Sequence, residues 1–149
     1  MLQLRGFRTQ GQEEMVIHLY SPFLDPAFAS GYTRIQAWEF RSFEDFEARA
    51  SPDDWAALYQ VNCFFAMMGL LYKRGLTSLD LLDDLLAGPS LMYWNKVAPL
   101  IHDMRERTNA PDLFQWAEYL ARALDGRLTA LGEAHPAFIE PHATTTHSM

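Results

Sequence analysis

The stretch from residue 52 to residue 74 restricts the fold more than any other part of the chain, because its apolar residues recur with helical spacing on most of its sides. Ser51 and Pro52 suit the N-cap and the first position of a helix, and two carboxylates follow where the helix dipole favours them. We expect the helix to end near Gly75, which follows two cations. One face carries Trp55, Leu58, Tyr59, Asn62, Phe65, Gly69 and Tyr72, and the opposite face carries Val61, Phe64, Met68 and Leu71. A helix that is apolar on both faces belongs in the middle of a bundle.

Two more helices are predicted to follow this one. Thr77 can cap a short connecting helix over residues 79–86, which Gly88 and Pro89 would close. Pro89 can also open the next helix, and Pro99 is expected to kink it. The apolar stripe of that helix keeps helical spacing through Leu91, Trp94, Val97, Ala98, Ile101, Met104 and Arg105.

The last predicted helix has the cleanest amphipathic pattern in the chain. Its apolar positions are Leu113, Trp116, Ala117, Leu120, Leu124, Leu128 and Leu131, and Gly132 can end it. From residue 135 onward the helical pattern is lost, so we expect residues 135–149 to form a flexible tail.

The first 50 residues are divided by Pro22, Pro26 and Gly31 into short pieces. Helices over residues 13–20, 26–40 and 43–49 are one interpretation of these pieces. A strand over residues 15–20 is an alternative for the first of them, because Val16, Ile17 and Tyr20 also suit a strand.

Length and composition favour one all-α domain. A chain of 149 residues fits a single domain that needs no disulfide, and Cys63 has no partner within it. With 12 Lys and Arg against 19 Asp and Glu, the net charge of −7 argues against direct binding of nucleic acid. No apolar run of the length of a membrane span is expected, and Glu13, Glu14 and His18 lie where a signal peptide would be apolar. We therefore expect a cytoplasmic, single-domain helical bundle over residues 1–134, with about four main helices, a proline-kinked helix and short peripheral helices.

Three segments of the predicted helices carry a resemblance to a known family. They are Asn62 to Leu76 (NCFFAMMGLLYKRGL), Tyr93 to Ile101 (YWNKVAPLI) with Arg105, and Trp116 to Ala121 (WAEYLA). Over about residues 51–124 the chain resembles the bacterial DUF4760 family of small helical proteins, which has no assigned activity. The resemblance implies a small helical domain and no particular chemistry. Several similar proteins carry an N-terminal membrane helix, and we expect none in this chain.

The sequence predicts no catalytic residue, no cofactor and no metal site. The thiol of Cys63 lies within the long apolar helix, where a thiol usually acts as a small hydrophobic group. No Gly-x-Ser-x-Gly elbow, phosphate-binding loop or dinucleotide fingerprint occurs. The candidate metal ligands fall in the predicted tail or on solvated helix faces; they are His135, His142 and His147, the pairs Glu14–His18 and His102–Asp103, and Asp80, Asp83 and Asp84.

Two polar residues, Asn62 and Arg105, are predicted to lie among apolar neighbours. If Asn62 is buried, its amide must be hydrogen-bonded, because an unpaired one costs on the order of 1–3 kcal/mol. Arg105 extends the stripe that contains Trp94, and it can pair with a carboxylate such as Glu118 or reach water. These residues either form a buried polar clamp that fixes the helix register or, together with Trp94, line a site for a ligand.

The segment Phe43-Glu44-Asp45-Phe46-Glu47 is the candidate interaction surface. Its acids could meet a basic partner, with the aromatic rings as anchors. Alternatively, the rings cover the core and the acids face water.

Three functional hypotheses follow from the sequence. The first is a non-catalytic interaction or regulatory protein of bacterial or phage origin, which acts through a partner protein or self-association as a homo-oligomer. The second is a small-ligand-binding module with a pocket between helices. The third is an enzyme whose site consists of scattered His and carboxylate residues, which requires a cleft that holds two such groups within hydrogen-bond reach.

Overall fold

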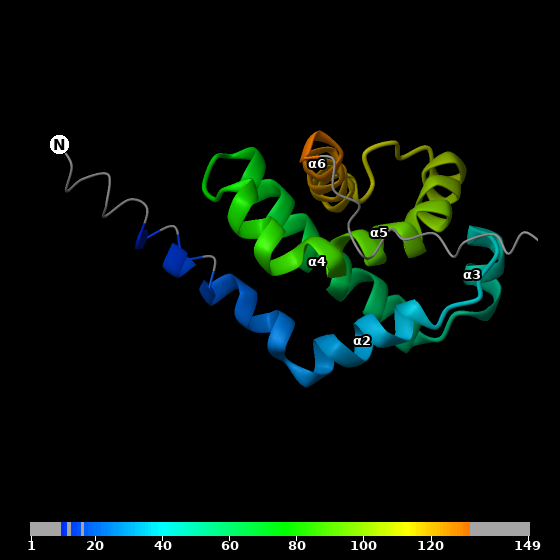
Figure 1. The fold of residues 1–149 in the computed structure, drawn as a ribbon. Coiled ribbons are helices and arrows are strands. Elements are labelled where there is room, and N and C mark those ends of the chain that lie inside the picture. Colours follow the sequence, from blue (N-terminus) through cyan, green and yellow to red (C-terminus); the bar gives the residue numbers. More distant parts are fainter. Residues whose placement is uncertain (1–9, 12, 16, 132–149) are drawn as a thin grey trace, which may run out of the picture.

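A computed structural model describes residues 10–131 apart from residues 12 and 16, and every element among them is helical (Figure 1). In chain order the elements are η1 (Ser21–Leu24), α2 (Pro26–Gln36), α3 (Phe43–Arg49), α4 (Pro52–Lys73), α5 (Leu79–Thr108) and α6 (Gln115–Leu131). Helical residues also precede η1, at 10–11, 13–15 and 17–20. The all-α prediction is confirmed, and the alternative of a strand over residues 15–20 is wrong at the described positions.

Helix α4 runs through the middle of the bundle, as its apolar composition predicts (Figure 1). It packs against α2 on one side and α6 on another, and it also contacts α5. Ser51 and Asp54 form a reciprocal capping box at its start, and Gly75 follows its end with φ of +70°. By length and composition α4 could also cross a membrane, with a mean hydropathy of 1.2 over its best window, of which 44% is buried inside the bundle. Packing in the core of the bundle accounts for the buried part of this window.

A glycine allows α4 and α6 to approach each other closely. A Cβ atom at Gly69 would lie 2.1 Å from the backbone carbonyl oxygen of Trp116 and 3.3 Å from the Cβ of Leu120. Any side chain at this position would therefore force the two helices apart. The backbone contact sets the position of α6, which carries much of the candidate site.

Helix α5 corrects the prediction of two helices separated at Gly88 and Pro89. The structure has one continuous helix of 30 residues with Pro89 and Pro99 inside it, and its N-cap is Ser78 rather than Thr77. Leu82, Leu86 and Leu91 are buried on both sides of Pro89, so packing outweighs the local stop signal. The Tyr32 hydroxyl also donates a hydrogen bond to the Pro89 carbonyl, at 3.0 Å.

The predicted kink at Pro99 brings together side chains from the two halves of α5. The ring centroids of Trp94 and His102 are 6.1 Å apart, and the guanidinium carbon of Arg105 lies 5.9 Å from the Trp94 centroid. On a straight helix, residues eight positions apart are separated by about 12 Å along the axis. In Figure 1 the yellow C-terminal part of α5 turns away from its green part, in agreement with these contacts.

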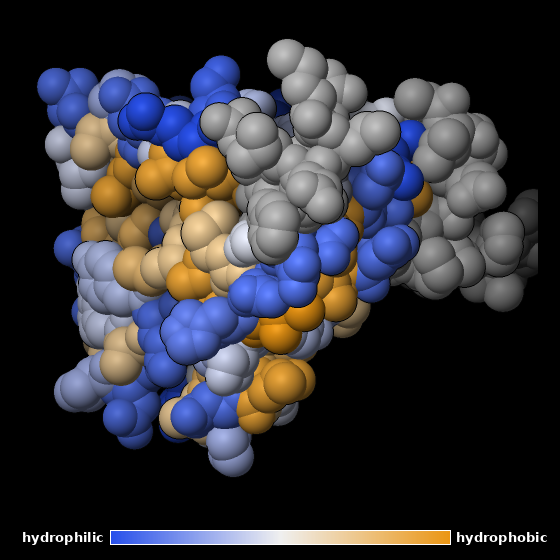
Figure 2. Space-filling view, turned by 90° about the vertical axis from the view of Figure 1, so that its left-hand side faces the viewer, coloured by the Kyte–Doolittle hydropathy of each residue, from blue (hydrophilic) through white to orange (hydrophobic). Residues whose placement is uncertain are grey.

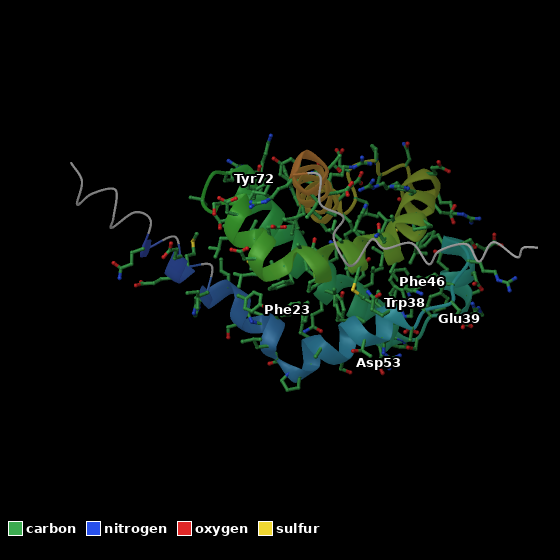
Figure 3. All side chains as sticks on the ribbon, viewed as in Figure 1. Phe23, Trp38, Glu39, Phe46, Asp53 and Tyr72 are labelled. Atoms are coloured by element: carbon green, nitrogen blue, oxygen red, sulfur yellow. The ribbon has the colours of Figure 1, made fainter. Side chains whose placement is uncertain are left out.

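Helix α2 ends at Gln36, earlier than the predicted residue 40. The chain leaves the helix so that the Trp38 indole N–H can donate to Asp54, at 3.0 Å, and the ring can pack on Phe46, with centroids 5.1 Å apart. Trp38 and Phe46 meet at the end of the bundle where α3 lies (Figure 3). The prediction for α3 over residues 43–49 is confirmed.

Helix α6 forms as its pattern predicts, and its buried positions are Ala117, Leu120, Ala121, Leu124 and Leu128. The expected stop at Gly132 and the expected tail at residues 135–149 lie outside the described residues.

Candidate functional site

Asn62 is part of a structural clamp between α4 and α5. Its side chain is 3% exposed, and its Oδ1 accepts a hydrogen bond from the Tyr93 hydroxyl at 3.0 Å. The Tyr93 ring is buried against Phe65, and burial raises the pKa of its hydroxyl far above the usual value. The bond therefore joins two neutral groups over the whole physiological range. It pairs the Asn62 carbonyl oxygen with the Tyr93 hydroxyl deep in the core, and Asn62 lines none of the grooves described below.

Arg105 joins α5, α6 and the connection between them. Its Nε donates to the Leu113 carbonyl oxygen at 2.8 Å, and its Nη1 donates to Oε2 of Glu118 at 2.6 Å. The Arg105 and Glu118 side chains are 14% and 16% exposed. The ion pair that the sequence suggests is thus present and largely shielded from solvent, which makes it stronger than a surface pair.

Glu118 is shared between two arginines. Its other oxygen, Oε1, accepts from Nε of Arg122 at 3.0 Å, one turn further along α6. Desolvation raises the pKa of Glu118, but the hydrogen bonds from Arg105 and Arg122 lower it, and the net shift is downward. Glu118 is therefore charged at neutral pH, with two cations and one anion in direct contact.

A groove of about 310 Å³ opens beside this ion triad; we call it the Arg105 groove, and it is lined by Arg105, Pro111, Gln115, Trp116, Glu118, Tyr119 and Arg122. A second hollow of about 380 Å³, lined by His102, Arg105, Glu106, Asn109 and Pro111, shares two of these residues. Arg105 and Pro111 therefore separate two adjoining hollows on the same α5–α6 face.

The connection between α5 and α6 adopts an unusual backbone at both of its ends. Asn109 caps α5 with φ of 51°, which asparagine tolerates well, and Phe114 has φ of 60°, which is strained for a bulky residue. Arg105 holds this connection through the Leu113 carbonyl, next to Phe114. Strain of this kind is common where a backbone is shaped for binding.

Aromatic rings form one wall of the Arg105 groove, and a third cation contacts one of these rings. The rings of Trp116 and Tyr119 meet edge to face at 5.8 Å, and Tyr72 contacts Tyr119 from α4. Nζ of Lys73 lies 5.6 Å from the Tyr119 centroid. The groove thus combines planar hydrogen-bond donors with flat apolar surface, an arrangement suited to an anionic ligand.

The three predicted ligand residues do not form one site. Trp94 lies beside Arg105 but is 8% exposed and lines neither hollow, and Asn62 is bonded to Tyr93 instead. Sequence reasoning missed the wall formed by Trp116, Tyr119 and Arg122. The spacing of these residues at intervals of three positions along a predicted helix was a usable signal.

The segment 43–47 has its two rings in the core. Phe43 is 5% exposed and Phe46 is fully buried, so neither ring reaches the surface. Among the acids, Glu44 accepts from Arg107 at 2.9 Å, while Asp45 pairs with Arg49, which lowers its pKa. This arrangement matches the interpretation in which rings cover the core and acids face water.

Groups of three or more His, Cys, Asp or Glu residues placed to hold a metal ion are absent from the part of the chain that the structure describes. His135, His142 and His147 lie outside that part. Cys63, whose thiol is expected to act as a small hydrophobic group, is exposed on α4.

The model of the family described as "Domain of unknown function (DUF4760)" matches residues 4–124. No curated protein and no solved structure matches the chain.

Proposed function

Since this chain belongs to the DUF4760 family, whose description assigns no function, we propose from its own residues that it is a non-catalytic interaction protein. It binds an acidic segment of a partner protein in the Arg105 groove. The observation that carries this proposal is the pair of arginines, Arg105 and Arg122, that share the single carboxylate of Glu118.

The local charge supports an acidic ligand. The charged residues that line the Arg105 groove are Arg105 and Arg122, with two positive charges, and Glu118, with one negative charge, on a chain whose net charge is −7. Such a positive site on an acidic protein attracts anionic groups selectively, because the rest of the surface repels them.

The hydrogen-bonding capacity of the groove supports the same conclusion. A guanidinium has five N–H donors in a planar fork that matches a carboxylate. Arg122 uses Nε for Glu118, and its side chain is 71% exposed, so the outer edge of the fork faces solvent at the rim of the groove. An incoming carboxylate could accept from these donors without breaking an existing hydrogen bond between described residues.

The shape favours an extended peptide over a small molecule. The two adjoining hollows form an open surface along the α5–α6 face, whereas small-molecule sites are usually concave enough to enclose most of the ligand. Trp116 and Tyr119 offer aromatic surface of the kind that anchors a partner's side chain.

The test is fluorescence anisotropy with a labelled peptide that has one tyrosine between two pairs of glutamates. We expect saturable binding that weakens with salt, and R122Q should weaken it about fivefold, because one charge-assisted contact is lost. K96Q is the matched control, since it removes the same charge from an exposed lysine of α5 that lines neither hollow. Equal weakening by R122Q and K96Q, or the absence of saturable binding, would overturn the proposal.

A second variant separates binding from stability. R105L should lower both the melting temperature and the peptide affinity, because Arg105 supports the groove and faces it. A lower melting temperature with unchanged peptide affinity would remove Arg105 from the binding surface. If inorganic pyrophosphate binds and the peptide does not, the groove serves a small anion instead.

A further inference from the structure

The outward face of α4 is a second surface, separate from the Arg105 groove. It is apolar along its middle, with Ala56, Tyr59, Cys63, Ala66, Met67 and Leu70 exposed or half-buried; we call it the α4 stripe. Tyr59 is 49% exposed and Met67 47% exposed, which is unusual for large apolar side chains of a central helix. Between Ala56 and Leu70, the other exposed side chain of α4 is the neutral Gln60. Figure 2 views the molecule from the end where α4 finishes, and apolar surface reaches this side as well.

The α4 stripe is symmetric about its centre. Tyr59 and Met67 lie four residues before and after Cys63, and Ala56 and Leu70 lie seven residues before and after it. Both spacings keep a residue on the same helix face. When two such helices lie antiparallel with the cysteines at the crossing, each ring of Tyr59 therefore meets Met67 of the other copy, a favourable contact between sulfur and an aromatic ring.

The charges at the two ends of α4 are complementary in the same arrangement. Asp53 lies in the first turn with its side chain 82% exposed and its Oδ2 4.0 Å from Nη2 of Arg34, and Arg74 is the exposed cap at the other end. The labels of Asp53 and Tyr72 in Figure 3 mark these opposite ends. Antiparallel copies place the acidic first turn of each α4 beside the basic last turn of the other, and they also oppose the helix dipoles.

We propose that two copies of this chain associate through their α4 stripes, antiparallel, about a two-fold axis that passes beside Cys63. A two-fold contact requires a patch that is complementary to itself, and the symmetric spacing and the end charges meet this requirement. From Ala56 to Leu70 the stripe is about 21 Å long, so the buried area is small and the dimer exchanges with monomer. None of the stripe residues lines the Arg105 groove, so each proposal can be tested independently of the other.

The first test is sedimentation velocity across the micromolar range. Wild type should shift from monomer to dimer as concentration rises, and M67K should weaken dimerisation at least about tenfold. M92K is the matched control, because Met92 is 45% exposed but lies on α5. A wild type that stays monomeric throughout, or an equal effect of M92K, would overturn the proposal. Binding of the monomer to anionic lipid vesicles, lost in M67K, would assign the stripe to a membrane surface instead.

The second test is disulfide formation with diamide. Each chain has one cysteine, so a covalent dimer joins Cys63 to its copy; diamide takes up the two electrons and two protons that the two thiols release. Moving the cysteine then tests the direction of the helices. A mixture of C63A/A56C and C63A/L70C chains should form the mixed dimer in excess over either homodimer, because positions 56 and 70 face each other when the helices are antiparallel. A dominant homodimer of C63A/A56C chains would show parallel helices and overturn the proposal.

Discussion

Asp54 at the start of α4 and Glu118 on α6 each pair with arginine beside aromatic rings, but their surroundings differ. Asp54 accepts from the backbone and hydroxyl of Ser51, from the Trp38 indole and from Arg34. Its acceptor capacity is filled by the chain itself. Glu118 has two arginines, and these have more donors than it can accept from.

The Asp54 cluster and the Glu118 cluster do not differ in the volume of the hollow beside them. A hollow of about 420 Å³ lies beside Asp54, comparable in size to those on the α5–α6 face. The two clusters differ instead in the balance between hydrogen-bond donors and acceptors. A carboxylate with four internal donors fixes the fold, whereas a cluster with surplus cations retains capacity for a ligand.

The largest expected effect comes from G69A, which should damage the groove and leave the Asp54 cluster in place. The new Cβ would collide with the Trp116 carbonyl, and a backbone clash cannot be relieved by a rotamer change. We expect a loss of about 3 kcal/mol or more in the free energy of unfolding, measured by urea denaturation. G126A on α6 is the control, because nothing lies within 4 Å of its Cβ, and it should be neutral or stabilising. Similar stabilities for the two variants would contradict the close helix contact.

The next largest effect is the loss of stability when each carboxylate, Asp54 or Glu118, is removed. D54A should cost about 3 kcal/mol, because it leaves the Trp38 indole and the Ser51 amide without their acceptor. E118A should cost about half as much, since Arg105 keeps its bond to Leu113 and reaches solvent through the groove. Chemical denaturation of both variants measures the difference. A larger loss for E118A would reverse our assignment of the structural and the binding cluster.

A pH series tests the charges of the same two carboxylates. Desolvation raises the pKa of Asp54, but hydrogen bonds, chiefly from Ser51 and Trp38, give a net shift below its usual 3.8; Glu118 is likewise shifted below 4.5. A folded pKa below the unfolded one stabilises the protein above the unfolded value, and this contribution disappears as pH falls through the folded value. The stability difference between wild type and D54N, and that between wild type and E118Q, should therefore be present at pH 7 and shrink below about pH 4. Stability differences that stay constant down to pH 2.5 would show that the charges of Asp54 and Glu118 contribute nothing to the stability of the fold.

The smallest expected changes in stability are at Thr77 and Ser78, just before α5, and they have opposite signs. S78A should cost about 1 kcal/mol, because the Ser78 hydroxyl accepts from the Leu81 amide as the N-cap. T77V should stabilise the protein by up to about 1 kcal/mol, because the buried Thr77 hydroxyl has no partner among the described residues. Thermal denaturation detects both changes. A destabilising T77V would restore Thr77 as the capping residue.

Local signals were sufficient to predict much of the fold. The caps and periodicity of α3, α4 and α6 identified these helices. The Arg105–Glu118 pair could be predicted because only one short connection separates the two helices that carry these residues. The continuity of α5 could not be predicted, because the residues that outweigh the helix-stop signal of Gly88 and Pro89 are buried against other helices. The bond between Asn62 and Tyr93 depends on a helix crossing, and the backbone of Phe114 follows from the packing around it, so neither has a signature in the sequence.

The close seating of α6 at Gly69 also has a consequence for synthesis of the chain. The face of α4 that contacts α2 can be covered as soon as α4 leaves the ribosome, because α2 comes first. The face beside Gly69 stays uncovered until α6 emerges, and the last residue of α6 comes 58 positions after the last residue of α4. At about 5–20 residues per second, this apolar face is exposed for about 3–12 s in every nascent chain. During that interval α6 of the same chain cannot yet cover this face of α4.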